Sequence, residues 1–271
     1  MFPFQGWLPQ ASVAPTPVTA LLHAVAVVKS GAFAVMRLTY YCFGTELIRG
    51  TWVHFVVMSI AMLSILYGST MAVKETHFKR RLAFSTVSNL SYILLGVTMM
   101  SPQGLLAGMA HLVFHAFMKI GAFFCAGAVL HQSGKTYVDE LNGLAKKMPF
   151  VFTTFVVFGL SLIGIPAFAG FISKWNIAAS AMELGNEYPF AYGAVAVLLY
   201  SALMTAVYVL TVAVRAWFPD QGSVGESKEE ITDPNWEMKL PLGIFTAAVL
   251  IWGLGSEPLM QILRAVAHGV F

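Results

Sequence analysis

The sequence is poor in charge, and most of its charged residues lie outside the long apolar runs. Only 11% of the 271 residues are charged while 58% are hydrophobic, and the mean hydropathy is +0.73. Soluble domains carry about 25% charged residues, so this composition excludes an ordinary soluble globular protein. The net charge of +3 is small and the basic residues fall in short loops, which gives no support for nucleic-acid binding.

Cysteine is also scarce. The two cysteines, Cys42 and Cys125, both lie in apolar stretches. Two thiols cannot complete a four-ligand zinc site or hold an iron–sulfur cluster. The sequence contains neither a P-loop nor a glycine-rich dinucleotide fingerprint after a strand. We therefore expect this chain to hold no cofactor.

Aspartate and glutamate are missing from the long apolar segments, and lie only in loops or at segment ends. Sodium is a hard cation, and such ions bind several oxygen ligands. Backbone and hydroxyl oxygens could supply them, but without a carboxylate the segments favour a proton as the transported ion.

What the sequence does contain is a series of long apolar runs. A helix needs about 20 mainly apolar residues to cross a bilayer. Seven segments satisfy this requirement: 18–41, 53–73, 82–100, 104–130, 150–180, 189–217 and 240–256. We therefore predict an all-α fold, a polytopic transmembrane helical bundle with about seven spans.

The fifth segment carries a glycine- and proline-rich interruption. Gly164, Pro166 and Gly170 fall in its middle and should break the helix. Broken helices at membrane depth are tolerated where they line a cavity or pack against protein. The interruption therefore predicts a functional region.

Loop charges predict the orientation. The loops after the second and fourth segments are basic, whereas 101–103 has no charge and 181–188 has two glutamates. The positive-inside rule then places the N-terminal segment and both basic loops in the cytoplasm. Residues 218–239 lie on the same side and are expected to form an acidic, solvated loop.

Three ionisable residues occupy the middle of the fourth segment. His111, His115 and Lys119 follow one another at intervals of four, about 6 Å of rise per step along one helix face. An ionisable group at this depth is costly unless it faces protein or water. Desolvation disfavours the charged amine and imidazole titrates near neutral pH, so the three offer proton sites of similar affinity. This interpretation is favoured over a lysine that reaches the membrane interface.

Lys29, His23 and Lys174 lie in comparable apolar surroundings. For Lys29 a functional role is favoured. His23 lies about 120° from it around a helix, and helix–helix hydrogen bonding is an equal alternative for this residue. Lys174 follows the interruption by four residues, where freed carbonyls and water can stabilise its charge. The alternative for Lys174 is an interfacial lysine.

The third segment is unusually polar. Its hydroxyl and amide side chains are expected to hydrogen-bond between helices or to hold water between Lys29 and Lys119. They are Ser85, Thr86, Ser88, Asn89 and Ser91. Three further histidines are expected to be solvated or interfacial: His54, His77 and His131.

Four groups of residues carry a family resemblance. They are Trp7-Leu8-Pro9 with 14–18 and 20–23, then 79–86, 111–119 and 170–174. In this order they resemble the antiporter-like membrane subunits of respiratory complex I, of Mrp-type sodium/proton antiporters and of membrane-bound hydrogenases. The resemblance covers about 1–217 and implies some fourteen helices in two inverted repeats, each with a broken helix.

The resemblance implies the following organisation of the chain. Residues 1–43 would be the end of the first repeat, and 51–217 a complete second repeat with five transmembrane helices. Residues 218–239 would be a cytoplasmic loop, and 240–271 a C-terminal transmembrane helix and tail.

The resemblance also implies roles for single residues. Lys29 corresponds to the central lysine of the eighth family helix, and Lys174 to the terminal position of the broken twelfth, where it would exchange protons with the outside. His111, His115 and Lys119 correspond to the two histidine positions and the lysine position of the eleventh family helix. His23 corresponds to a histidine found in some members. Together with Lys29 and Lys174 these residues would relay protons and are the predicted relay residues.

One departure from the family concerns the N-terminal side. Family members have several more helices before the Trp-Leu-Pro run, with a glutamate and a lysine that form an ion pair. Neither position occurs in this sequence. We therefore expect a fragment, a truncated gene product, or a split subunit that another chain completes.

These observations predict a proton-translocating membrane subunit of a redox-driven ion pump, similar to NADH:quinone oxidoreductase or a membrane-bound hydrogenase. Its partners would be other membrane subunits and lipid, with no nucleic acid, in a bacterial or archaeal cell membrane. Any oxidoreductase activity would belong to the assembly. Two alternatives stay open: an Mrp-type Na⁺/H⁺ antiporter subunit, and a truncated scaffold subunit that does not transport.

Overall fold

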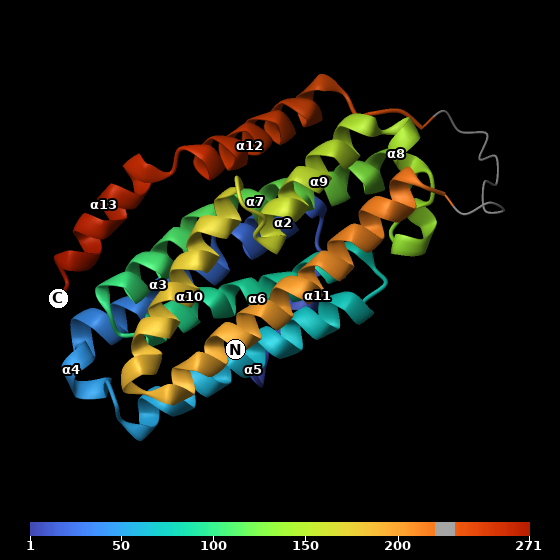
Figure 1. The fold of residues 1–271 in the computed structure, drawn as a ribbon. Coiled ribbons are helices and arrows are strands. Elements are labelled where there is room, and N and C mark those ends of the chain that lie inside the picture. Colours follow the sequence, from blue (N-terminus) through green and yellow to red (C-terminus); the bar gives the residue numbers. More distant parts are fainter. Residues whose placement is uncertain (220–230) are drawn as a thin grey trace.

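The structure is a computed structural model that describes residues 1–219 and 231–271. Over these residues it is built of helices and contains no β-strand, only an isolated bridge between His77 and Tyr137. Figure 1 shows an elongated bundle in which the long helices lie side by side. The predicted all-α fold is confirmed.

The long helices follow a region of short ones. The N-terminal part contains α1 (Trp7–Gln10), α2 (Thr16–Ala24), α3 (Val27–Arg37) and α4 (Thr45–Ile48). The long helices are α5 (Trp52–Lys74), α6 (Phe78–Thr98), α7 (Pro102–Ser133), α9 (Pro149–Ile163), α10 (Ala169–Glu187), α11 (Tyr192–Trp217), α12 (Trp236–Leu254) and α13 (Glu257–His268), with the short α8 (Leu144–Lys147) between α7 and α9. The remaining turns are η1 (Phe4–Gly6), η2 (Ala11–Val13), η3 (Leu38–Phe43), η4 (Val138–Leu141) and η5 (Pro189–Ala191).

The centre of the bundle is the pair α6 and α7. Nineteen of the 21 residues of α6 are buried, including its hydroxyl and amide side chains. Two glycines let the helices approach closely, because a Cβ on Gly96 would lie 3.0 Å from the backbone nitrogen of Gly108. Helices α12 and α13 run along one side of the bundle and pack against α7 (Figure 1). The polar residues of the third predicted segment therefore face protein.

Five helical segments of the described residues are long and apolar enough to cross a membrane. They are Thr16–Phe43, Trp52–Lys74, Pro102–Ser133, Pro189–Trp217 and Trp236–Leu254. Helix α6 falls outside this set because basic and hydroxyl residues lower its apolarity, and α9 because it has only 15 residues. The count of seven spans and the division into repeats stay predictions.

The first predicted span, 18–41, is not one continuous helix. Helix α2 ends at Ala24 and α3 begins at Val27. At the break the backbone N–H groups of Val25 and Ala26 both donate to the carbonyl of Leu21, at 3.1 and 3.0 Å. After Arg37 the chain winds more widely, as a π-helix over η3.

Two loop predictions were wrong in part. Residues 181–188 were expected to be a loop, but α10 continues to Glu187 because Ala181, Leu184 and Gly185 still face the core. In the acidic stretch 218–239, residues 220–230 lie outside the described part. Asp233 is not simply solvated, since it accepts hydrogen bonds from the backbone N–H groups of Phe150 (3.1 Å) and Val151 (3.4 Å), in the first turn of α9.

Candidate functional site: a buried row of amines and imidazoles

Helix α7 places its three ionisable residues inside the bundle. His111, His115 and Lys119 are all fully buried. The two imidazole rings stack with centroids 5.7 Å apart. Lys119 Nζ donates to the Leu82 carbonyl at 3.0 Å and to the Ser85 hydroxyl, both on α6. The face of α7 that carries these three residues is therefore turned toward protein, where buried polar groups find hydrogen-bond partners.

Lys29 joins this row from α3. Its Nζ lies 2.5 Å from Nδ1 of His115, although the two residues are 86 positions apart in the sequence. Either the ammonium donates to a neutral imidazole, or an Nδ1–H donates to a neutral amine. The two side chains thus share one hydrogen between two titratable groups. Lys29 lies only three residues after the break at Val25–Ala26, so the break helps to set the position of α3 and of this lysine.

The other end of the row meets a second interruption. Helix α9 ends at Ile163, Gly164 has φ +94°, and α10 begins at Ala169. Lys174 in α10 donates to the last carbonyls of α9, those of Leu162 (2.6 Å) and Ile163 (3.2 Å). The C-terminal carbonyls of a helix lack intrahelical partners and carry partial negative charge, so they suit a cation.

The residues of the interruption have different surroundings. A Cβ on Gly164 would lie 3.1 Å from Cδ of Lys174, and one on Gly170 would lie 1.9 Å from the carbonyl oxygen of Ser161. Both glycines therefore occupy places that a side chain would disturb. Pro166 is exposed in the connecting turn. The Gly170 N–H donates to the Ser161 hydroxyl at 3.1 Å, which fastens the start of α10 to α9.

Ser173 connects α10 to the row on α7. Its hydroxyl lies 2.8 Å from Nδ1 of His111, and Ser173 directly precedes Lys174. The structure therefore brings together five of the six predicted relay residues in one buried region: Lys29, His111, His115, Lys119 and Lys174.

His23 is held differently. Its ring nitrogens lie 2.9 Å from the carbonyl of Thr19 and 2.8 Å from that of Leu8, and its ring packs against Phe123 with centroids 5.3 Å apart. Both nitrogens are thus engaged with the backbone. Among the described residues no hydrogen bond joins His23 to the row, which favours the alternative of a helix-packing group.

Sequence reasoning missed Tyr92. This α6 residue is fully buried, and its hydroxyl donates to Ser201 of α11 at 2.5 Å; Ser201 is in turn hydrogen-bonded to Ser69 of α5. A signal was present, since Tyr92 lies three residues after Asn89 and seven after Ser85. That spacing puts all three on one face of α6.

The row keeps unused hydrogen-bonding capacity. Within the part of the chain that the structure describes, His111 Nε2, His115 Nε2 and Asn89 Oδ1 are buried without a protein partner. Native proteins commonly satisfy such atoms with ordered water. Free donor and acceptor sites beside the imidazoles are what a chain of proton transfers needs.

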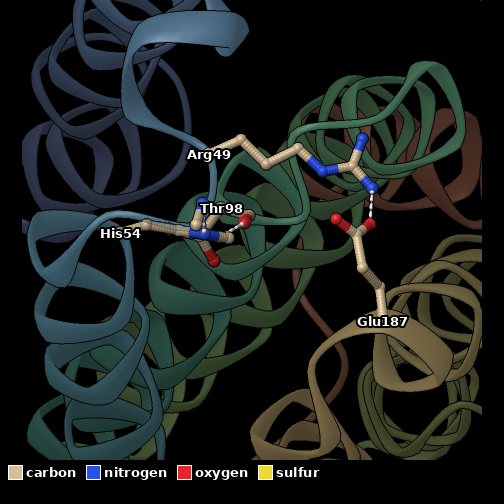
Figure 2. Close-up of polar contacts among 5 residues, drawn as sticks. Arg49, His54, Thr98 and Glu187 are labelled. Carbon is tan, nitrogen blue, oxygen red and sulfur yellow. Dashed lines mark hydrogen bonds and ion pairs between the residues drawn. The ribbon is translucent and has the colours of Figure 1, made fainter.

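His54 was expected to be solvated or interfacial but is fully buried. Its Nε2 lies 2.5 Å from the carbonyl of Thr98, near the end of α6, and its Nδ1 accepts from the Gly50 N–H at 3.2 Å. Figure 2 shows this contact beside the ion pair of Arg49 with Glu187, which ties the α4–α5 turn to the end of α10. Carbonyls at a helix C-terminus lack intrahelical donors, which explains the role of the histidine.

The other two histidines lie nearer the surface. His131 is exposed and His77 is half-buried in the turn between α5 and α6. Burial lowers the pKa of His77, with Glu75 acting in the opposite direction. These positions agree with the expectation of an interfacial or solvated environment.

Comparison with known proteins gives consistent relatives. The family model described as NADH:quinone oxidoreductase/Mrp antiporter, TM matches residues 1–215. The chain is 36% identical over 260 residues to NADH-quinone oxidoreductase subunit N of Desulforudis audaxviator, covering 94% of this chain and 50% of that protein. It is 33% identical over 263 residues to Na(+)/H(+) antiporter subunit A1 of Staphylococcus saprophyticus, covering 92% and 32%. The chain thus spans half the length of the first relative and a third of the second.

The fold also resembles a solved structure of a membrane complex. The Mrp complex from Dietzia sp. contains a chain that superposes with a TM-score of 0.85 at 25% identity. The superposition covers 99% of this chain and 56% of that one. The arrangement of helices described above is therefore that of a polytopic membrane subunit.

Proposed function

We propose that this chain, which belongs to the NADH:quinone oxidoreductase/Mrp antiporter family of membrane proteins, translocates protons as a membrane subunit of a redox-driven pump. The observation that carries the proposal is the buried row in which Lys29 contacts His115, the imidazoles stack, and Ser173 links His111 to Lys174's helix. A relative named as a subunit of NADH-quinone oxidoreductase supports the redox-driven assembly.

The row can move protons because each of its members exists in two states that differ by one proton. The amines of Lys29 and Lys119 are buried and that of Lys174 is partly buried. None of the three has a carboxylate partner, since the ion pairs of the described residues all lie elsewhere. Like charges in a poorly solvated interior repel, so protonation of one amine favours loss of the proton from the next. A proton entering at one end then promotes release from the other, as coupled titrations do.

The driving reaction is assigned to partner chains. We place this subunit in a bacterial or archaeal membrane, next to other membrane subunits and lipid. A further chain or segment would supply the additional family helices that the resemblance implies on the N-terminal side. Electron transfer in partners would change the electrostatic field or the conformation that the amines experience, and protons would move in response.

Replacement of Lys119 tests the proposal. In membrane vesicles that contain the whole assembly, Lys119→Ala should reduce the protons translocated per electron by at least about half, because one buried amine is lost from the row. Electron transfer should partly survive. Proton movement is followed with a pH-sensitive dye while electron transfer is recorded in parallel.

The matched control is Lys146→Ala, which removes an exposed lysine of α8. It should leave the ratio of protons to electrons at the parent value. A parent ratio in the Lys119→Ala assembly would refute a relay through this residue.

A second candidate function is sodium/proton exchange without a redox partner. The likeness to an Mrp complex and to a Na(+)/H(+) antiporter subunit favours it. Proton flux that depends on a sodium gradient, and that persists when no electron donor is present, would support this function over the redox-driven one.

A further inference from the structure

Tyr92 lies where the α7 row meets the broken helix. Its ring is fully buried and stands edge-to-face against His111, with centroids 5.4 Å apart at 90°. The Nζ atom of Lys174 lies 4.9 Å from the centroid of the same ring. One aromatic side chain of α6 therefore contacts both the end of the imidazole pair and the lysine that follows the break.

The hydrogen bonds of Lys174 leave one side of its ammonium group to face the ring of Tyr92. An ammonium has three N–H donors. Two are used on the carbonyls of Leu162 and Ile163, at the end of α9. The negative face of an aromatic ring attracts a cation within about 6 Å, and the attraction is greater in a desolvated site. The ring of Tyr92 completes the environment of the charged amine.

The orientation of the ring is set from outside the row. The Tyr92 hydroxyl donates its proton to Ser201, and Ser201 is hydrogen-bonded to Ser69. All three residues are fully buried, on α6, α11 and α5 respectively. Because Nζ of Lys174 lies over the ring, while the Tyr92 hydroxyl is directed to Ser201, the ring meets Lys174 through its face.

We infer that Tyr92 is a positioning residue that holds the charged side chain of Lys174 beside His111 through its aromatic face, with Ser201 and Ser69 as the anchor. The consequence for transport rests on the proposed function. The ring attracts the ammonium form of Lys174 and not the neutral amine. Loss of the proton therefore weakens the contact that keeps Lys174 next to His111.

Other titratable groups act on Lys174 as well, and the test has to hold them constant. From α7 they are His111, His115 and Lys119. Helices α6 and α11 also pack against α10, and their charged or titratable residues besides Tyr92 are Lys79, Arg80, Arg81, Tyr192, Tyr200, Tyr208 and Arg215. Helix α9 carries no titratable side chain, and those of α12 lie in its first turn: Glu237 and Lys239. A change confined to the ring of Tyr92 leaves all of them in place.

The experiment measures the protonation of Lys174 directly. The assembly is labelled with lysine that carries ¹⁵N in its side chain and placed in lipid bilayers, and the Lys174 signal is identified by its loss in Lys174→Gln. The pH of half-protonation is then compared between the parent, Tyr92→Phe and Tyr92→Leu. Tyr92→Leu should lower this pH by about one unit, a tenfold loss of proton affinity, whereas Tyr92→Phe, which loses the hydrogen bond to Ser201 but keeps the aromatic face, should lower it by less.

A second series keeps the inference testable if Tyr92→Leu does not fold. Phenylalanine with one, two or three ring fluorines at position 92 weakens the negative face with little change of shape. The pH of half-protonation should fall step by step along this series. A constant value along it, or an equal fall in Tyr92→Phe and Tyr92→Leu, would overturn the inference, because the aromatic face would then have no part.

This result can be separated from the proposed function. A shift along the fluorine series with normal proton transport in Lys119→Ala supports the contact between Tyr92 and Lys174 and refutes the relay. No shift together with lost transport in Lys119→Ala refutes the contact and supports the relay.

Discussion

At the scale of single residues, the row depends on amines that have no carboxylate partner. Lys29 is satisfied by an imidazole, Lys119 by a carbonyl and a hydroxyl, and Lys174 by carbonyls and an aromatic ring. A buried carboxylate would hold each lysine in its charged state. Neutral partners stabilise the ammonium less, so the amine can release its proton without leaving an unpaired negative charge behind.

His115 gives a residue-scale prediction. His115→Gln keeps an amide within reach of Lys29 Nζ but removes the titratable imidazole between Lys29 and His111. Proton translocation in vesicles should fall to less than about one tenth of the parent, in line with the effect of removing a proton-transfer group. The control His131→Gln, on the exposed end of the same helix, should transport like the parent. Equal rates in both variants would contradict a path through His115.

At the residue scale, the sequence singles out candidate residues where one residue type carries the signal alone. An ionisable side chain inside an apolar run is costly, and this cost identified Lys29, Lys119 and Lys174. The burial of His54 could not be seen in the same way, because it depends on a carbonyl of another helix, 44 residues away. Tyr92 was missed because an aromatic residue in a helix is commonly a packing residue.

At the scale of elements, the interruption between α9 and α10 is supported by α12. Ala167, a residue with a side chain, is held at φ +74° in this turn. A Cβ on Gly253 of α12 would lie 2.1 Å from the carbonyl oxygen of Ala167 and 2.6 Å from Cα of Phe168. The close approach of α12 therefore covers the strained turn and contributes to holding it in place.

Gly253 gives the prediction at this scale. Gly253→Ala should destabilise the protein by about 1–3 kcal/mol, because the new methyl group overlaps backbone atoms that cannot move without shifting the turn. Gly243→Ala on the same helix meets open space and should stabilise it by up to about 1 kcal/mol. Thermal unfolding in detergent measures both. If Gly253→Ala unfolded at or above the temperature of Gly243→Ala, the packing described here would be wrong.

The two helix breaks show what a sequence can reveal about elements. The interruption after Ile163 contains Gly164, Pro166 and Gly170, whose local backbone preferences end a helix. The break at Val25–Ala26 has neither glycine nor proline, and on its two sides α2 packs mainly against α7 and α3 against α6. Only a break with local causes is visible in one sequence.

At the scale of the whole molecule, polar and apolar surfaces are arranged as in a membrane protein. Large apolar side chains are exposed along α5 and α11, among them Leu63, Leu199, Leu203 and Val214. The ionisable row lies on the opposite side of these helices, between α6, α7 and α10. Lipid can cover the outer surface while the row stays within protein, as transport of a proton across the membrane requires.

The chain spans half the length of its relative from Desulforudis audaxviator. Composition and resemblance predicted the helical class and the family, because both depend on many residues at once. The number of spans could not be predicted equally well, since α6 is buried in protein and does not need the apolarity of a lipid-facing helix.

Simultaneous replacement of Lys29, Lys119 and Lys174 by alanine tests the central claim most directly. The control assembly carries alanine at three exposed lysines instead: Lys74, Lys146 and Lys147. Proton translocation and electron transfer are measured together in vesicles. The account predicts that the first assembly still transfers electrons in part but translocates no protons through this subunit, while the control behaves like the parent. Undiminished proton translocation after loss of all three amines would show that the chain is a scaffold and would contradict the account.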